Sequence, residues 1–308
     1  MSMSLNLPRS ISGKDWCWRA GVNDERDTDF TPDDLLNRLL LARGVARVDL
    51  AVQRRPTLRT LMPDPALFVD MEKAAHRLAD AVIAREKMVI FGDYDVDGAT
   101  SAALLIRLLR ALGHDASYYI PDRLLEGYGP SGAALLRLGE AGAQLIVTVD
   151  CGAQAFDALA QAHGAGLEVI VVDHHQCAPE LPTALALVNP NRLDENAQGA
   201  AHGHLAAVGV AFLLGAALVR DLRGRGYFAT CPEPDLLTLL DLVALGTVAD
   251  VAQLKGLNRA FVAQGVKVMA ARRNTGLSAL IDVAGLKRAV QCSDLGFALG
   301  PRINAGGR

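Results

Sequence analysis

Three aspartates occupy alternate positions in the segment FGDYDVDGATSAAL at residues 91–104: Asp93, Asp95 and Asp97. They follow an apolar run and precede a series of small residues that is typical of a helix. Carboxylates a few ångströms apart repel one another unless a cation or a proton offsets their charge. The segment therefore indicates either a metal site or a solvated turn that caps a helix.

Two other apolar segments also end in aspartate. LIVTVD ends at Asp150, and EVIVVDHH carries Asp173 followed by His174 and His175. A later apolar segment, LVALGTVADV, contains Asp250. Because the carboxyl ends of parallel strands line one crevice, the strand-end residues are expected to converge, namely Asp95, Asp97, Asp150, Asp173, His174 and His175. Carboxylate and imidazole ligands suit Mn²⁺ or Mg²⁺, and four or five of them could hold two ions roughly 3.5–4 Å apart, as in the hydrolysis of phosphate esters.

Less specific interpretations exist for each of these residues. A single aspartate at a strand end is more often a helix cap or a turn former than a ligand. Asp-x-Asp-x-Asp-Gly also opens a calcium-binding EF-hand loop, but Leu104 stands where that loop needs glutamate, and a strand precedes it. Three strand ends that all carry aspartate are harder to explain as caps, so we favour the metal site.

The elements that position these residues follow from the pattern along the chain. From about residue 71, helical segments such as MEKAAHRLADAVIARE and ATSAALLIRLLRALG alternate with the apolar strands MVIFGDYD, ASYYI, LIVTVD and EVIVVD. This pattern predicts an α/β fold, a parallel sheet with helices on both faces, followed by a mostly helical segment from about residue 203. Residues 1–70 are expected to be an N-terminal extension with one short helix at 33–44.

Composition excludes several classes of protein. The 308-residue chain has a net charge of −3, so any nucleic-acid binding must depend on a local patch. Its five cysteines, at 17, 151, 177, 231 and 292, form no CxxC pair, which suits a reducing cytosol, and Cys151 and Cys177 are interpreted as buried thiols. The N-terminus has no apolar signal segment, and the run from Leu205 to Val219 is too short to span a bilayer. We expect a cytoplasmic protein with no membrane partner.

GDYDVDG, TVDCG, VVDHH and GTVADV, in this order, resemble the motifs of the DHH phosphoesterase superfamily. IPDRLLEGYG, LVNPNR, AAVGVAFLL, ALGTVADVAQLKGLNR and LGPRINAGGR are similar to motifs of its bacterial single-stranded-DNA-specific exonucleases. The resemblance covers roughly residues 70–308. It implies a hydrolase of phosphodiester bonds that uses Mn²⁺ or Mg²⁺ and releases mononucleotides from single-stranded DNA in the 5′→3′ direction. It also implies a role in recombinational and mismatch repair, with a single-stranded-DNA-binding protein and a repair helicase as partners.

The resemblance further implies a role for each residue. Asp95 and Asp150 would bind one ion, and the second ion would be bound by Asp97, Asp150, His174 and Asp250. Asp93 and His175 would be catalytic residues beside the ions, with the His175 imidazolium contacting the scissile phosphate. The nucleophile would be a water whose pKa the metals lower. Arg123 and Arg302 would bind backbone phosphate. His114, His163, His202 and His204 are interpreted as structural.

Two features depart from the pattern of the superfamily. Phe91 stands where many members have histidine, so the first ion is expected to bind more weakly, through Asp95, Asp150 and water. The chain stops at Arg308 inside a motif, so we expect a DHH catalytic domain at 71–254 and a helical linker at 255–308 that leads to a second domain. Two alternatives remain: a phosphoesterase for pyrophosphate, cyclic dinucleotides or very short oligonucleotides, and a catalytically inactive scaffold.

Overall fold

A computed structural model describes residues 9–14 and 31–306, so Cys17 and the last two residues of LGPRINAGGR lie outside it. The chain divides into two compact units, Met1–Thr57 and Leu58–Arg308. The described part of the first unit contains α1 (Pro32–Ala42), the 3₁₀ turn η1 (Arg47–Asp49) and α2 (Leu50–Arg54). α1 begins with a capping box between Thr31 and Asp34, which accounts for the short helix predicted there. The proposed boundaries at residues 70 and 254 stay predictions.

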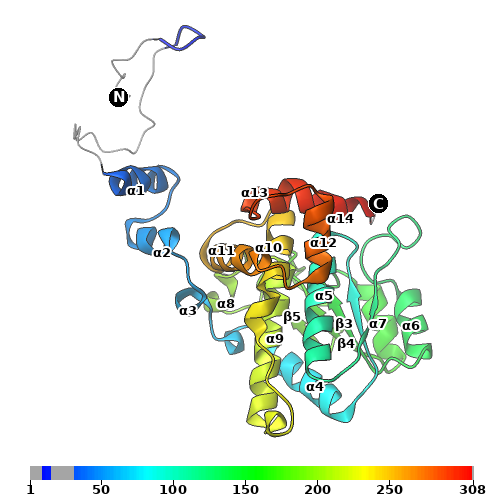
Figure 1. Cartoon of the computed structure of the whole chain (residues 1–308). Helices are drawn as coiled ribbons and strands as arrows, with labels where there is room; N and C mark the ends of the chain where they lie inside the picture. Colours follow the sequence, from blue (N-terminus) through cyan, green and yellow to red (C-terminus); the bar gives the residue numbers. More distant parts are fainter. Residues whose placement is uncertain (1–8, 15–30, 307–308) are drawn as a thin grey trace. The chain divides into compact units, whose positions relative to one another are not determined.

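A five-stranded parallel sheet forms the centre of the second unit (Figure 1). Its strand order is β2-β1-β3-β4-β5. The strands are β1 (Met88–Gly92), β2 (Ser117–Tyr119), β3 (Leu145–Val149), β4 (Glu168–Val172) and β5 (Ala186–Val188). Gly92 pairs with Val149, and Val149 pairs with Val172, so β1, β3 and β4 end at the same level of the sheet.

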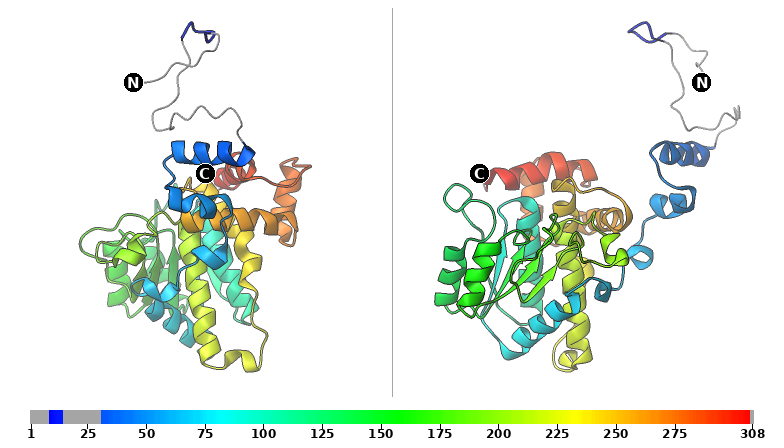
Figure 2. Two further views of the ribbon diagram at one scale, coloured as in Figure 1. Left: turned by 90° about the vertical axis from the view of Figure 1, so that its left-hand side faces the viewer. Right: turned by 180° about the vertical axis from the view of Figure 1, so that it is seen from behind.

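Helices cover both faces of this sheet, as the sequence predicted. Successive side chains of a strand point to opposite faces, so Met88 and Ile90 join one apolar cluster while Val89 and Phe91 join another. The first cluster is completed by α4 (Met71–Ala84), α5 (Val96–Ala111) and α9 (Ala207–Gly224). The second is completed by α6 (Gly132–Glu140) and α7 (Phe156–Gly164). The right-hand view of Figure 2 shows α6 and α7, in green, across the strands from α9 in yellow-green.

The start of α5 differs from the sequence-based boundary. The apolar run predicts a strand that continues through Asp95, but β1 ends at Gly92 and α5 begins at Val96. The reason is that Asp95 is the N-cap of α5, with its Oδ1 accepting a hydrogen bond from Gly98 N at 3.0 Å. The helix ends as predicted, because Gly113 follows the C-cap with a φ of +75°.

The remainder of the second unit is mostly helical, as predicted. The run from Leu205 leads into α9, most of whose residues are buried. The other helices of this part are α8 (Ala197–Ala200), α10 (Leu240–Ala249), α11 (Gly256–Ala270), α12 (Thr275–Val283), α13 (Cys292–Asp294) and α14 (Gly300–Gly306). Shorter turns are η3 (Tyr227–Ala229), η4 (Leu236–Leu239) and the π-helical η5 (Leu295–Leu299), while α3 (Leu58–Leu61) and η2 (Pro65–Leu67) precede α4. No helix among the described residues has the length and apolar character needed to cross a membrane.

Candidate metal centre

An aspartate stands one residue beyond the end of each of three neighbouring strands. Asp93 N donates to Val149 O at 3.2 Å, and Asp150 N donates to Val172 O at 3.0 Å. Asp173 N continues the row by donating to Val188 O at 3.1 Å. All three residues are buried. Because β1 and β3 flank the point where the strand order reverses, the row lies where open α/β sheets bind ligands. Asp150 and Asp173 therefore lie side by side at this edge, as predicted, and Asp93 lies beside them.

Asp97 approaches the same place from the first turn of α5. Its carboxylate is buried and accepts hydrogen bonds from Ala207 N at 2.6 Å and Val208 N at 2.9 Å, the first two residues of α9. Burial raises the pKa of Asp97 well above its ordinary value, and the charge of Asp250 raises it further. An aspartate of this segment can therefore both cap a helix and be a candidate metal ligand. Asp95 caps α5, Asp97 binds the start of α9, and both side chains face the row of aspartates.

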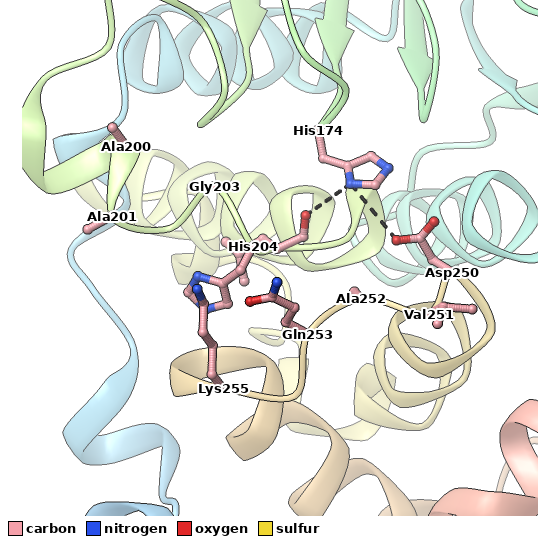
Figure 3. Close-up of a pocket in the computed structure, with 11 residues that line it drawn as sticks. His174, Ala200, Ala201, Gly203, His204, Asp250, Val251, Ala252, Gln253 and Lys255 are labelled. Atoms are coloured by element: carbon pink, nitrogen blue, oxygen red, sulfur yellow. Dashed lines mark hydrogen bonds and ion pairs between the residues drawn. The ribbon is translucent and has the colours of Figure 1, made fainter. Parts of the chain in front are cut away.

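His174 lies between the candidate ligands. Its Nε2 is 3.3 Å from Asp150 Oδ1 and 3.9 Å from Asp97 Oδ2. Its Nδ1 is 3.1 Å from Leu205 O and 4.0 Å from Asp250 Oδ2 (Figure 3). A carbonyl oxygen is only an acceptor, so Nδ1 carries the proton of the neutral ring and Nε2 presents a lone pair. A backbone carbonyl on the second ring nitrogen is the usual support of a metal-binding histidine.

Three groups of side chains have ligand atoms that all lie within 4.8 Å of one another: Asp93, Asp95 and Asp150; Asp97, His174 and Asp250; Asp150, His174 and His175. Three buried atoms of these groups have no hydrogen-bond partner among the described residues: Asp93 Oδ1, Asp150 Oδ1 and His174 Nε2. A buried polar atom without a partner is costly. These atoms therefore fit divalent cations that prefer oxygen and imidazole ligands.

The backbone of Asp150 is held in an unusual conformation. Its φ is +62°, in the left-handed region that residues other than glycine rarely adopt. Such a conformation costs about 1–3 kcal/mol and is concentrated at functional sites. Tyr128 helps to hold it, because its hydroxyl donates to Asp150 O at 3.0 Å. Burial raises the pKa of the Asp150 carboxyl well above its ordinary value, and the charges of Asp97 and Asp95 add to this effect.

His175 is oriented by Asp173 at the edge of the centre. His175 Nδ1 lies 2.7 Å from Asp173 Oδ1, and this hydrogen bond raises the pKa of His175. Asp173 Oδ1 also accepts from His174 N at 2.7 Å. Burial alone would raise the pKa of Asp173, but its hydrogen bonds, above all that to His175, hold it below its ordinary value. Asp173 therefore favours its ionised form and binds the backbone of His174 and the ring of His175. Nε2 of His175 points away from Asp173.

Comparison with protein families gives a direct match for this arrangement. Residues 87–247, which are more than half of the chain, match the family described as "DHH family, N-terminal domain". The chain belongs to the DHH family.

The chain is similar to several proteins named single-stranded-DNA-specific exonuclease RecJ. It is 43% identical over 279 residues to the single-stranded-DNA-specific exonuclease RecJ of Dickeya dadantii, covering 89% of this chain and 47% of that protein. It is 40% identical over 295 residues to the RecJ of Escherichia coli, covering 94% of this chain and 50% of that protein. The chain thus spans about half the length of the curated relatives it matches. Among solved structures, RecJ from Thermus thermophilus in complex with Mn²⁺ superposes with a TM-score of 0.69 at 33% identity, covering 88% of this chain and 36% of that one.

The two arginines that are predicted to bind backbone phosphate lie in different surroundings. Arg123 is exposed and stacks 5.0 Å from the centre of the Tyr94 ring. Tyr94 contacts Tyr128, whose ring in turn contacts His175, so this arginine is joined to the centre by aromatic rings. Arg302 Nη1 donates to Ala298 O. The proposed phosphate contacts of both arginines stay predictions.

Phe91 is fully buried, and its ring stacks on Tyr119 with centroids 5.2 Å apart. The side chain that accompanies Asp95 and Asp150 at the first candidate ion site is instead Asp93. Cys151 and Cys177 are buried thiols, as predicted, and burial raises the pKa of both.

Several positioning residues were missed in the sequence. Asn191 Nδ2 donates to His174 O at 2.5 Å, and Asn189 Nδ2 donates to His175 O at 2.8 Å. Asn304 Oδ1 accepts from Val96 N at 3.2 Å in the first turn of α5. The signal was present, because these asparagines belong to the segments LVNPNR and LGPRINAGGR. Without the fold, however, nothing in those segments shows which backbone groups the asparagines bind.

Proposed function

We propose that this chain is the catalytic part of a metal-dependent 5′→3′ exonuclease that releases 5′-mononucleotides from single-stranded DNA. The observation that carries the proposal is the convergence of Asp95, Asp97, Asp150, His174 and Asp250 at the carboxyl edge of the sheet. The similarity to RecJ proteins supports the substrate class. We further propose that it acts in the cytoplasm in recombinational and mismatch repair, with a single-stranded-DNA-binding protein and a helicase as partners.

The candidate ligands divide into two sets that share one residue. Asp95, Asp150 and Asp93 would hold the first ion, and Asp97, His174 and Asp250 would hold the second together with Asp150. Bound Mn²⁺ or Mg²⁺ would lower the pKa of a water and offset charge on the phosphoryl oxygens. Asp150 fits the bridging role, because its Oδ1 is unpartnered among the described residues and its backbone is fixed by Tyr128.

His175 supports the proposed chemistry from the solvent side. Its side chain is 45% exposed, and the bond to Asp173 orients the ring and favours the imidazolium. An imidazolium aimed at the scissile phosphate donates a hydrogen bond to an oxygen on which negative charge develops. Arg123, placed by its stacking on Tyr94, is suited to bind a second phosphate of the strand.

Digestion of single strands labelled at the 5′ or the 3′ end tests this proposal. With Mn²⁺ or Mg²⁺, the 5′ label should appear first as a mononucleotide, and EDTA should stop the reaction. A duplex of the same sequence is the control and should resist digestion. Release of the 3′ label first would contradict the proposed polarity. Hydrolysis of dinucleotides or pyrophosphate in preference to longer strands would instead favour a small-substrate phosphoesterase.

A further inference from the structure

A cavity of about 440 Å³ opens beside the candidate metal centre (Figure 3). Two segments line it: residues 200–205, from the end of α8 towards α9, and residues 250–255, between α10 and α11. At its inner end the cavity shares His174 and Asp250 with the centre, while Lys255 lies beside His204 at the other end. Its volume is in the range of ligand pockets, ~300–1,000 Å³. A DNA strand bound at the proposed ions would therefore have room to continue into this cavity.

The two walls are fixed to each other and to the centre by buried amides. Asn258, which is fully buried, donates through Nδ2 to His204 O at 2.6 Å and to Gln253 O at 3.1 Å, one carbonyl on each wall. Asn191 Nδ2 donates to Gly203 O at 3.0 Å as well as to His174 O. A Cβ at position 203 would approach Asn191 Oδ1 to 2.3 Å, so a larger residue there would displace the side chain that binds His174 O. The cavity is therefore preformed, which lowers the entropic cost of binding.

Lys255 gives the outer end of the cavity a positive charge. It is exposed and forms no ion pair with a carboxylate among the described residues. It is also the N-cap of the 15-residue α11, whose first turn has no side-chain cap. Amides of an uncapped first turn and a nearby ammonium group both favour an anion.

The other ionisable groups of the cavity determine when an anion is favoured. Burial, followed by the charge of Lys255, lowers the pKa of His204 to about 4, so this ring is neutral at neutral pH. Asp250 carries a carboxylate that would repel an anion at the inner end. Divalent cations at the centre would offset that charge, so anion binding is expected mainly in the metal-loaded protein.

We propose that this cavity binds the backbone phosphate and sugar of the nucleotide adjoining the scissile bond, with Lys255 pairing with that phosphate. The inference rests on the proposed function, because it assumes a polynucleotide bound at the metal centre. It gives residues 200–205 and 250–255 a role in binding the substrate, in addition to the proposed role of Asp250 as a metal ligand.

Binding of a fluorescein-labelled (dT)₁₂ to the full chain, measured by anisotropy across a KCl series, tests the role of Lys255. Ca²⁺ replaces Mn²⁺ to slow hydrolysis. Lys255→Gln should weaken binding about five- to ten-fold at low salt and reduce the slope of log K against log [KCl] by about 0.7, the value for one phosphate contact on a single strand. Lys255→Glu should weaken binding further. Lys267→Gln, in the last turn of the same helix and outside the cavity, is the control and should match the wild type.

A second substrate separates this inference from the proposed function. Bis(4-nitrophenyl) phosphate has no adjoining phosphate, so its Mn²⁺-dependent hydrolysis should be equal in the wild type and in Lys255→Gln. Lack of (dT)₁₂ binding by the wild type, an unchanged salt slope in Lys255→Gln, or equal loss of activity on both substrates would overturn the inference. Failure of the wild type to hydrolyse either substrate would contradict the proposed function, while the order of (dT)₁₂ affinities would still decide the role of the cavity.

Discussion

Asp97 and Asp150 are both buried carboxylates at the centre, but their partners differ. Asp97 accepts hydrogen bonds from two amides of α9, whereas Asp150 Oδ1 has no hydrogen-bond partner among the described residues. Removing the charge of Asp97 should therefore lower the stability of the metal-free protein, whereas removing the charge of Asp150 should not. We therefore propose that Asp97 also supports the fold, whereas Asp150 serves mainly to bind the proposed ions.

Asp150→Asn should abolish metal-dependent hydrolysis and leave the metal-free protein at least as stable as the wild type. The substitution removes a buried charge that Asp97 and Asp95 repel. Since changes even to residues that only support a ligand cost about 10–100-fold, we expect a loss of about a hundred-fold or more. Turnover at saturating Mn²⁺ and urea unfolding in EDTA are the two measurements.

Asp97→Asn is the matched comparison. Its amide NH₂ would face one of the two α9 N–H groups, and the resulting unpaired donors should lower the free energy of unfolding in EDTA by about 1–3 kcal/mol. Hydrolysis should be lost here too. If Asp150→Asn proved the less stable of the two without metal, the assignment of their different roles would be wrong.

At the scale of the elements, Arg192 joins the start of α4 to the end of β5. Its guanidinium is largely buried and donates to Asp70 Oδ2 at 2.9 Å, to Leu187 O at 2.6 Å and to Asp194 Oδ1 at 2.7 Å. Asp70 Oδ2 also accepts from Leu187 N at 3.1 Å. These bonds fix the connection that carries Asn189 and Asn191, and through them the backbone of both histidines.

Arg192→Met should lower the free energy of unfolding by about 2–4 kcal/mol, because it leaves Asp70 and Leu187 O without their buried partner. Urea unfolding in EDTA measures the effect without a contribution from metal. Arg223→Met is the control, since Arg223 pairs with Glu233 on the exposed surface. Equal effects of the two substitutions would show that the buried network does not support this connection.

His114 should make the stability of the fold depend on pH. It is buried, and burial followed by the charge of Arg85 lowers its pKa. The unfolded chain takes up a proton below about pH 6.5, while the folded chain does so only at lower pH. Stability should therefore fall as pH decreases from about 6.5 through the folded pKa.

His114→Gln should make this acid-side loss of stability smaller than in the wild type, and unfolding in urea at several pH values between about 5 and 7.5 measures it. His163→Gln, at an exposed position, should keep the wild-type dependence. The same dependence in all three proteins would mean that His114 is not the group responsible.

The strands and the row of aspartates could be predicted from the sequence, because apolar runs that end in aspartate carry both signals locally. Contacts between distant segments could not. Asp97 binds amides 110 and 111 positions further along the chain, and no periodicity reports such a bond. The left-handed backbone of Asp150 depends on Tyr128, which lies on another loop. The position of Asp93 beside Asp95 and Asp150 likewise appears only once the strand ends are in register.

For the whole molecule, metal binding should be linked to stability. A ligand that binds only the folded state at a hundred times its Kd adds about 2.7 kcal/mol per site. Mn²⁺ should therefore raise the melting temperature of the wild type, and excess EDTA should reverse the increase. Asp150→Asn should show a much smaller response, because it lacks the carboxylate shared by both sets of ligands. An equal response of the two proteins would place the bound metal elsewhere.

The central claim is that the carboxyl edge of the sheet holds two divalent ions that share Asp150. Anomalous diffraction from crystals of the chain grown with Mn²⁺ tests it most directly. We predict two peaks roughly 3.5–4 Å apart, one among Asp93, Asp95 and Asp150 and the other among Asp97, Asp150, His174 and Asp250. A single peak that Asp150 does not contact, or no peak at this edge, would contradict the account.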